Sequence, residues 1–169
     1  MTKTKNNLAI IIFAYNRFNH FKKTFLALMN NEKINEFKIF VFIDGPKNDY
    51  DKSQSQEIEN FLRKKKLGNK LEIRKNLVNK GLKNSIIDGV TEVFNEYFKV
   101  IVLEDDIVTN KNFIKFMSRS LNYYEKHDHI GTITGYSFID LDKNYPHLIY
   151  LSQRHASWGW ATWKNTGVM

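Results

Sequence analysis

The sequence contains no cysteine, so disulfides, thiolate zinc sites and cysteine nucleophiles are all excluded. Proline is scarce, with two residues in 169, and 42% of the chain is apolar, which argues against a disordered or fibrous protein. No apolar run reaches the roughly 18–20 residues that span a bilayer. The apolar stretch at 8–14 lacks a small-residue cleavage site, so we expect no secretory signal. These absences predict a cytoplasmic protein, with contact to the inner face of the cell membrane left open.

Three well-known sequence motifs are also missing. The chain has neither the G-x-x-x-x-G-K-[ST] phosphate-binding loop nor a G-x-G-x-x-G motif, and no Ser/His/Asp order is evident. These absences argue against P-loop kinases and ordinary dinucleotide dehydrogenases.

The chain is basic, with 26 Lys and Arg residues against 18 Asp and Glu residues, a formal net charge of +8. Such a surface favours a polyanion, an anionic membrane face or a phosphorylated substrate, but a solvated lysine-rich surface explains it equally well. No aromatic and basic RNA-binding motif accompanies the charges, so we expect no nucleic-acid partner.

Short β-branched runs alternate with longer helical periods along the chain. This pattern predicts one α/β domain over residues 1–169, with three α/β/α layers and a mostly parallel central sheet. The predicted strands lie at 8–14, 38–43, 71–74, 100–103, 130–136 and 148–151. The predicted helices are one capped by Asn19, others at 53–66 and 81–97, and one capped by Thr109 or Asn110.

Polar side chains follow three of the predicted strands at the point where each strand ends. They are Tyr15-Asn16-Arg17, Asp44-Gly45 and Glu104-Asp105-Asp106. In an open parallel sheet, ligands bind beyond the carboxyl ends of the strands. We therefore expect these groups to meet at one crevice.

The triplet Glu104-Asp105-Asp106 is the sharpest of these signals. Three adjacent carboxylates repel one another unless a cation or hydrogen-bond donors neutralise them. In an extended segment Glu104 and Asp106 point one way and Asp105 the other. Carboxylate oxygens suit Mg²⁺ or Mn²⁺ held together with substrate phosphates. The alternative is a solvated acidic turn that stabilises the next helix through its dipole.

The other segments carry weaker signals. Asp44-Gly45-Pro46 has an ordinary alternative as a turn, and Arg17 as a surface arginine. The segment 80–83 at a helix start either binds an anion or is a plain loop. The three tryptophans at 157–163 are separated by Gly159 and Ala161, which favours the edge of an aromatic-walled pocket over plain core.

In this order, the motifs resemble the glycosyltransferase A-fold. The resemblance is to bacterial family-two-like sugar transferases and to the Golgi N-acetylglucosaminyltransferase I group, and it extends from about Leu8 to Trp163. The motifs that carry it are Phe13-Ala14-Tyr15-Asn16-Arg17, Ile43-Asp44-Gly45, Asn79-Lys80-Gly81-Leu82, Val102-Leu103-Glu104-Asp105-Asp106 and Ser157-Trp158-Gly159-Trp160-Ala161-Thr162-Trp163.

The resemblance implies a role for each matching position. The implied donor-binding residues are Ala14, Tyr15, Arg17, Asp44, Gly45, Gly81, Lys83, Glu104, Asp105 and Trp160. Among them, Asp44 would bond a uracil-type base, Glu104 would touch the donor sugar, and Asp105 would touch the ribose or sugar. Asp106 would be the direct ligand of Mn²⁺ or Mg²⁺.

The implied activity is metal-dependent transfer of a sugar from a nucleoside diphosphate sugar, with a UDP-sugar favoured. The acceptor would be a hydroxyl of a glycan or lipid-linked molecule in cell-surface glycan synthesis, with inversion at the anomeric carbon. Similar enzymes continue past the aromatic motif, so we expect a C-terminally shortened chain whose general base lies beyond Met169. Alternatives are a binding-only remnant and a sugar nucleotidyltransferase.

Overall fold

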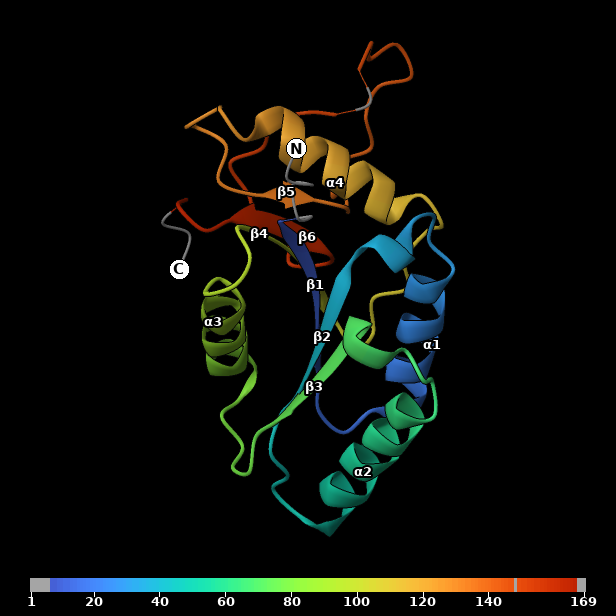
Figure 1. Cartoon of the computed structure of the whole chain (residues 1–169). Helices are drawn as coiled ribbons and strands as arrows, with labels where there is room; N and C mark the ends of the chain where they lie inside the picture. The colour runs from blue at the N-terminus through green and yellow to red at the C-terminus, as the bar shows by residue number, and fades with distance from the viewer. Residues whose placement is uncertain (1–6, 148, 167–169) are drawn as a thin grey trace.

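The structure is a computed structural model that describes residues 7–147 and 149–166. Its strands form one six-stranded sheet in the order β3-β2-β1-β4-β6-β5 (Figure 1). The strands are β1 (Leu8–Ala14), β2 (Lys38–Ile43), β3 (Leu71–Lys75), β4 (Lys99–Glu104), β5 (Ile133–Thr134) and β6 (Trp160–Trp163). The α-helices are α1 (Phe18–Met29), α2 (Asp49–Arg63), α3 (Leu82–Val93) and α4 (Phe113–Tyr124). Short 3₁₀ turns lie at Ile34–Glu36 and Gly68–Lys70.

The sheet is mostly parallel, as predicted. β1 lies between β2 and β4 and is parallel to both, and β2 is parallel to β3. In the register, Ile11 of β1 stands beside Phe40 on one side and Val102 on the other. β6 runs antiparallel to β4, and β5 antiparallel to β6.

Helices cover both faces of the sheet, which gives the three predicted layers (Figure 1). Alternate residues of β1 face opposite sides, so Ile10 and Ile12 pack with α1, α2 and α4, whereas Ile11 and Phe13 pack with α3. Every residue of β1 is buried because helices cover both faces of the sheet, and the strand is accordingly apolar throughout.

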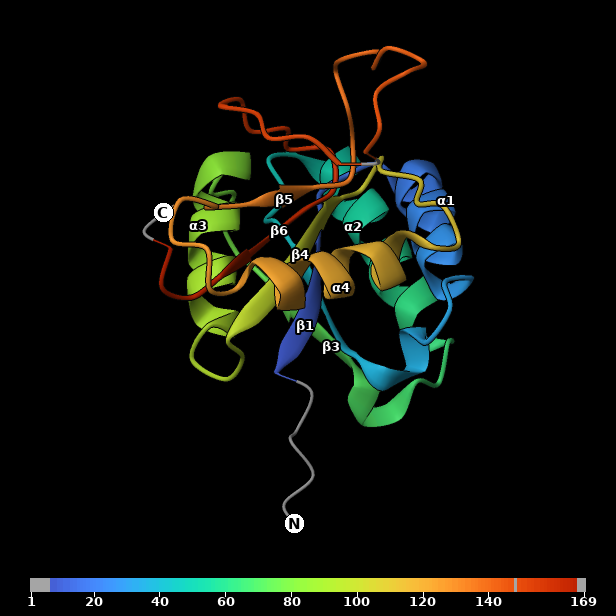
Figure 2. The ribbon, with the colours of Figure 1, turned by 90° about the horizontal axis from the view of Figure 1, so that it is seen from above.

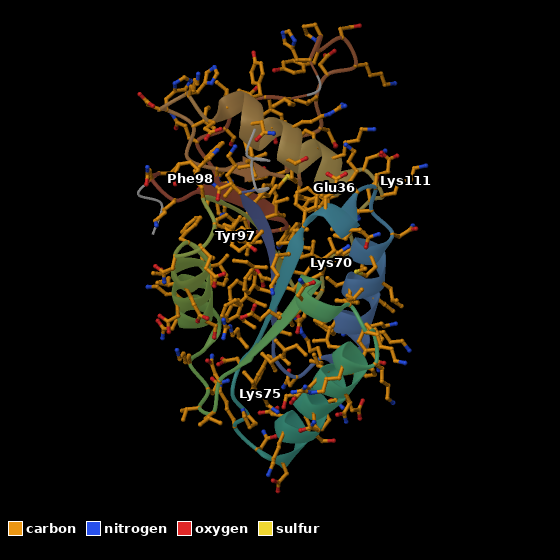
Figure 3. The ribbon with its side chains drawn as sticks, in the orientation of Figure 1. Glu36, Lys70, Lys75, Tyr97, Phe98 and Lys111 are labelled. Carbon is orange, nitrogen blue, oxygen red and sulfur yellow. The ribbon has the colours of Figure 1, made fainter. Side chains whose placement is uncertain are left out.

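Tyr97 and Phe98 connect α3 to β4 (Figure 3). The Tyr97 ring packs edge-on against Phe40 of β2, with 5.8 Å between centroids. This contact anchors α3 to the sheet. None of the helices in residues 7–147 and 149–166 has the length and apolarity to cross a membrane.

Two strand predictions need correction. Residues 149–151 are loop rather than strand, and Leu148 lies outside the described residues. The sixth strand is instead β6, made by the tryptophan motif. The fifth strand, predicted at 130–136, is limited to Ile133–Thr134. The long segment between β5 and β6 extends away from the sheet as loop (Figure 2).

Three helix starts also differ from the predictions. α1 begins at Phe18, so Asn19 lies inside it rather than at its cap. α2 begins at Asp49, four residues before the predicted start, because the Asn48 side chain accepts a hydrogen bond from the Asp51 N–H. The cap position of α4 is Asn112, not Thr109 or Asn110.

Candidate functional site

The three polar strand ends lie at one edge of the sheet. β2, β1 and β4 are neighbours and parallel, so the loops that follow them leave from the same edge. In Figure 1 these loops lie at the lower end of the sheet, where α2 begins. The structure therefore brings the predicted segments together.

Arg17 connects two of these segments. One guanidinium nitrogen, Nη2, donates to Oδ1 of Asp105, and Nη1 donates to Oδ2 of Asp106 over 3.0 Å. Asp105 is buried, whereas the Asp106 side chain is 39% exposed. The two aspartates differ in exposure, yet one arginine reaches both. They lie in the turn after β4, so the alternation predicted for an extended segment stays a prediction.

The ionisation of the triplet follows from burial and from this arginine. Burial raises the pKa of Asp105, although the Arg17 guanidinium opposes the rise. Burial and the charges of Asp106 and Asp105 raise the pKa of Glu104. Burial lowers the pKa of Arg17, but the hydrogen bonds and charges of the two aspartates outweigh it and the pKa rises.

The backbone at the triplet is held by α1. The buried hydroxyl of Thr24 donates to the main-chain oxygen of Asp105 over 2.9 Å. Farther along, the buried Asn31 at the end of α1 donates to the Thr109 hydroxyl and accepts from the Ile114 N–H. α1 therefore fixes both ends of the connection between β4 and α4.

Asp44 forms a second fixed point, on the loop after β2. Its Oδ1 accepts hydrogen bonds from the Asn76 amide and from the N–H groups of Gly45 and Lys80, and its Oδ2 accepts from the Gly81 N–H. Burial raises its pKa, but these four donors outweigh burial and the pKa is lowered. In this structure Asp44 holds the loop before α3, and its predicted bond to a base stays a prediction.

Gly45 allows this loop to approach closely. A Cβ at position 45 would lie 2.3 Å from the main-chain carbon of Val78, so a side chain has no room there. The Asn79 amide also donates to the Gly45 oxygen over 2.8 Å. Ala14 is 6% exposed and its oxygen accepts from the Asp44 N–H, so its methyl group belongs to the core.

The positive side chains before and within α3 are differently placed. Lys80 pairs with Asp88 over 2.6 Å. Among the described residues, Lys83 has no ion-pair or hydrogen-bond partner, and it is exposed. Gly81 has a φ of 76°, which favours glycine, and its N–H is occupied by Asp44.

Asp51 joins the loop after β1 to the start of α2, and the sequence analysis missed it. Its Oδ2 accepts from the Tyr15 hydroxyl over 2.5 Å and from the Lys47 N–H over 3.1 Å, and its Oδ1 accepts from the Asn16 amide over 2.7 Å. Burial and this carboxylate raise the pKa of Tyr15 to about 12. The phenol is therefore a neutral donor at physiological pH.

A sequence signal for Asp51 did exist. Asn48 and Asp51 stand three residues apart, the spacing at which a capping side chain and the third helical residue interact. The predicted helix began at Ser53, which left Asp51 in a loop. The long-range partners Tyr15 and Asn16 lie about 35 residues away, beyond any local pattern.

A pocket of about 860 Å³ opens on the other side of Asp106. Its lining residues are His20, Asp106, Ile107, Val108, Thr109, Asn110, Asn112, Phe113, Phe116, Gly135, Tyr136 and Trp158. Polar groups of the β4–α4 connection and aromatic rings share this wall. The pocket is a natural place for a ligand that meets Asp106 from the α4 side.

The three tryptophans divide between core and pocket. Trp160 and Trp163 are 6% and 4% exposed and belong to β6, whereas Trp158 is 47% exposed and lines the pocket. Of the three tryptophans predicted to form a pocket edge, Trp158 is the one that lines the pocket. The buried Trp160 ring contacts His155, with 5.1 Å between centroids, and its predicted place beside the donor sugar stays a prediction.

The triplet has the oxygen groups that a divalent cation requires. Its three carboxylates face one arginine, so negative charge is left over when all are ionised. Among the described residues the Glu104 carboxylate has no hydrogen-bond partner, and Asp106 is partly exposed. No group of three His, Asp or Glu side chains in the described part of the chain has metal-binding geometry. One or two of these carboxylates together with substrate phosphates fit Mg²⁺ or Mn²⁺.

Solved structures share this fold. One is a mannosyltransferase, PcManGT from Pyrobaculum calidifontis in complex with GDP-Man and Mn²⁺, with a TM-score of 0.58 and 7% identity. The match covers 76% of this chain and 34% of that one. Another is S. aureus TarS 1–349, with a TM-score of 0.53 and 17% identity, covering 70% of this chain and 33% of that one. The matched region thus amounts to about a third of each of these chains. A comparison with curated proteins finds no match.

The sheet order and the likeness to these structures show a glycosyltransferase A-fold. The sequence also matches the family Glycosyl transferase family 2 over residues 9–168. The chain therefore belongs to glycosyl transferase family 2. The likeness to the N-acetylglucosaminyltransferase I group stays a prediction.

Proposed function

We propose that this chain binds a nucleoside diphosphate sugar at the strand-end crevice and takes part in transferring the sugar to an acceptor hydroxyl. The observation that carries the proposal is the Arg17 bridge to Asp105 and Asp106, at the edge where Tyr15 and Asp44 also lie. A cation and carboxylates placed together recognise a diphosphate and its counter-cation better than they serve a core.

In this proposal each group has a separate task. Arg17 donates to diphosphate oxygens and stabilises the negative charge that builds up as the diphosphate leaves. Tyr15 and Asn16, held by Asp51, shape the wall of the crevice on the α2 side. Asp44 keeps the loop before α3 in place beside the base, and Glu104 and Asp105 contact the sugar and ribose.

We propose Asp106 as the residue that holds Mg²⁺ or Mn²⁺. When bound, this cation supplies positive charge to the diphosphate leaving group. The mannosyltransferase neighbour was solved with GDP-Man and Mn²⁺, which supports a nucleotide sugar and a divalent cation as ligands of this fold. A UDP-sugar is our preferred donor because the motifs resemble enzymes of that specificity.

The remaining parts of the proposal concern the acceptor and the place of action. We propose an acceptor in a cell-surface glycan or on a lipid carrier, transfer with inversion, and action at the inner face of the cell membrane. The net charge of +8 supports contact with an anionic surface. Inversion requires a general base that deprotonates the acceptor hydroxyl.

A transfer and hydrolysis assay tests this function. The chain is incubated with UDP-, GDP- and dTDP-sugars, Mn²⁺ and a panel of acceptors, and release of nucleoside diphosphate is measured. We expect release that depends on Mn²⁺ and is lost in Asp106→Ala. Metal-dependent binding without turnover, in this chain and in a longer one, would instead establish a binding-only protein.

A further inference from the structure

Three exposed aromatic rings gather beside the pocket near Asp106. Tyr136, Phe138 and Trp158 are 45%, 58% and 47% exposed. Their centroids lie 4.6 Å apart for Tyr136 and Trp158, 5.2 Å for Tyr136 and Phe138, and 5.4 Å for Phe138 and Trp158. We call these three residues the aromatic platform. Single exposed hydrophobic side chains are common on protein surfaces, whereas a contiguous exposed cluster of large rings marks a binding site.

The platform is held against the sheet at defined points. The Gly135 N–H donates to the Gly159 oxygen over 2.8 Å, which joins the residues just before Tyr136 and just after Trp158. Cβ atoms at positions 135 and 159 would lie 2.4 Å and 3.1 Å from the Phe113 ring. The two glycines therefore let Phe113, the first residue of α4, pack against the segments that carry the platform, which fixes where the rings meet the pocket.

Several polar side chains of the same pocket have hydrogen-bonding groups that no internal contact uses. Within residues 7–147 and 149–166, the side chains of His20 and Asn112 have no hydrogen-bond partner, and Asn110 uses only its oxygen. Together with Asp106 these groups present donors and acceptors a short way from the aromatic rings. A lipid chain would leave them unpaired, whereas a sugar would pair them.

A pyranose has the matching chemistry. Its axial C–H groups form an apolar face that stacks on an aromatic ring, and its hydroxyls form a hydrogen-bonding edge. We propose that the aromatic platform binds a pyranose ring of the acceptor glycan, with the hydroxyl edge turned into the pocket toward Asp106. The inference rests on the proposed function, since it makes the acceptor a saccharide and places it opposite the donor diphosphate across the triplet.

Trp158 gives a direct optical measurement of this binding. The chain has three tryptophans, and Trp160 and Trp163 are buried, so iodide quenches mainly Trp158 fluorescence. The probes are neutral tetrasaccharides of glucose, galactose and N-acetylhexosamines, in α- and β-linked forms, without donor and without metal. We expect at least one probe to protect Trp158 from iodide in a saturable manner.

Variants identify the contact. Trp158→Ala is followed by saccharide-induced thermal shift or by NMR saturation transfer, and we expect affinity to fall by about fivefold to tenfold. Trp158→Phe keeps a stacking ring and should retain most of the affinity. Tyr123→Ala is the matched control, because Tyr123 is a 69% exposed ring on α4 that does not line the pocket.

The outcomes separate this inference from the proposed function. Protection of Trp158 by a tetrasaccharide in the wild type, together with weaker binding of that saccharide to Trp158→Ala in the thermal-shift or saturation-transfer measurement, supports the platform. If no tetrasaccharide protects Trp158 while a nucleotide sugar still binds with Mn²⁺, the platform proposal is overturned and the donor site stands. Protection of Trp158 by UDP instead of saccharide would also overturn it, because the rings would then belong to the donor. Tetrasaccharide protection without any nucleotide-sugar binding would leave the platform and remove the donor site.

Discussion

Arg17 is the residue on which the charge balance of the crevice depends. It is half exposed, yet it donates to the buried Asp105 and to Asp106 at once. A buried carboxylate without a charged donor is costly, because the low-dielectric surroundings give it no water. Arg17 therefore stabilises the ionised triplet when no ligand is bound.

The variant Arg17→Gln tests this role. We expect the free energy of unfolding to fall by about 1–2 kcal/mol, since Asp105 loses a charged hydrogen bond. We also expect Mn²⁺ alone to stabilise the variant more than the wild type, because the aspartates then lack a cation. Thermal unfolding over a Mn²⁺ titration measures both effects, with Arg63→Gln as the control, because the Arg63 side chain at the end of α2 is exposed. Equal Mn²⁺ shifts in variant and wild type would contradict competition between Arg17 and a metal.

The lowered pKa of Asp44 predicts that part of the free energy of unfolding depends on pH in the acid range. Its pKa in the folded chain lies below the ordinary value of 3.8, so its stabilising effect is complete above 3.8 and is lost as pH falls through the folded pKa. Asp44→Asn should cost about 1–3 kcal/mol at pH 7, because one carboxylate oxygen is replaced by a donor. The difference from wild type should narrow below pH 3.8.

Urea unfolding of both proteins between pH 7 and pH 3 measures this difference. Asp128→Asn, at an exposed turn, should show little change at either pH. A difference that stays constant across this range would mean that Asp44 acts through packing rather than through its charge.

At the scale of elements, Asp51 ties the start of α2 to the loop after β1. Three donors from two loops converge on its carboxylate, and Asp51 is only 3% exposed. This contact sets where Tyr15 and Asn16 stand relative to Arg17. The link explains why a residue of α2 belongs to the crevice although no strand-end motif contains it.

Substitution of Asp51 should therefore affect two properties. Asp51→Ala leaves the Tyr15 hydroxyl, the Asn16 amide and the Lys47 N–H without their acceptor, and we expect a loss of about 2–3 kcal/mol in urea unfolding. Tyr15→Phe removes one of the three bonds and should cost about 1 kcal/mol. If Asp51 also positions the crevice, a nucleotide sugar will bind Asp51→Ala more weakly even at temperatures where the variant is fully folded. Unchanged affinity would limit Asp51 to stability.

The strand predictions were correct where burial on both faces of the sheet requires a run of apolar residues. β1 is apolar throughout, and β2 and β4 are apolar apart from charged residues at their ends, because helices cover both faces of the sheet. β6 was missed because Trp160 and Trp163 enclose Ala161 and Thr162, and this short motif suggested a pocket wall. Its strand conformation depends on pairing with β4, about 60 residues away, which no local period encodes.

At the scale of the whole molecule, the meeting of the polar strand ends follows from the sheet topology. Parallel neighbours β2, β1 and β4 bring three distant segments to one edge, so the convergence of Arg17 with the triplet could be predicted. The hydrogen-bond partners of the individual side chains at this edge could not be predicted. Asp44 fixes a loop through four donors, and Asp51 enters from a helix, because each pairing is decided by three-dimensional proximity.

The most direct test of the account is a thermal-shift screen of UDP-, GDP- and dTDP-sugars, with and without Mn²⁺, on the wild type and on Asp106→Ala. A ligand that binds only the folded chain at 100 times its Kd stabilises it by about 2.7 kcal/mol. We predict that at least one nucleotide sugar raises Tm in a Mn²⁺-dependent way, and that Asp106→Ala loses the Mn²⁺-dependent part. No shift with any donor, or a full Mn²⁺-dependent shift retained in Asp106→Ala, would contradict the account.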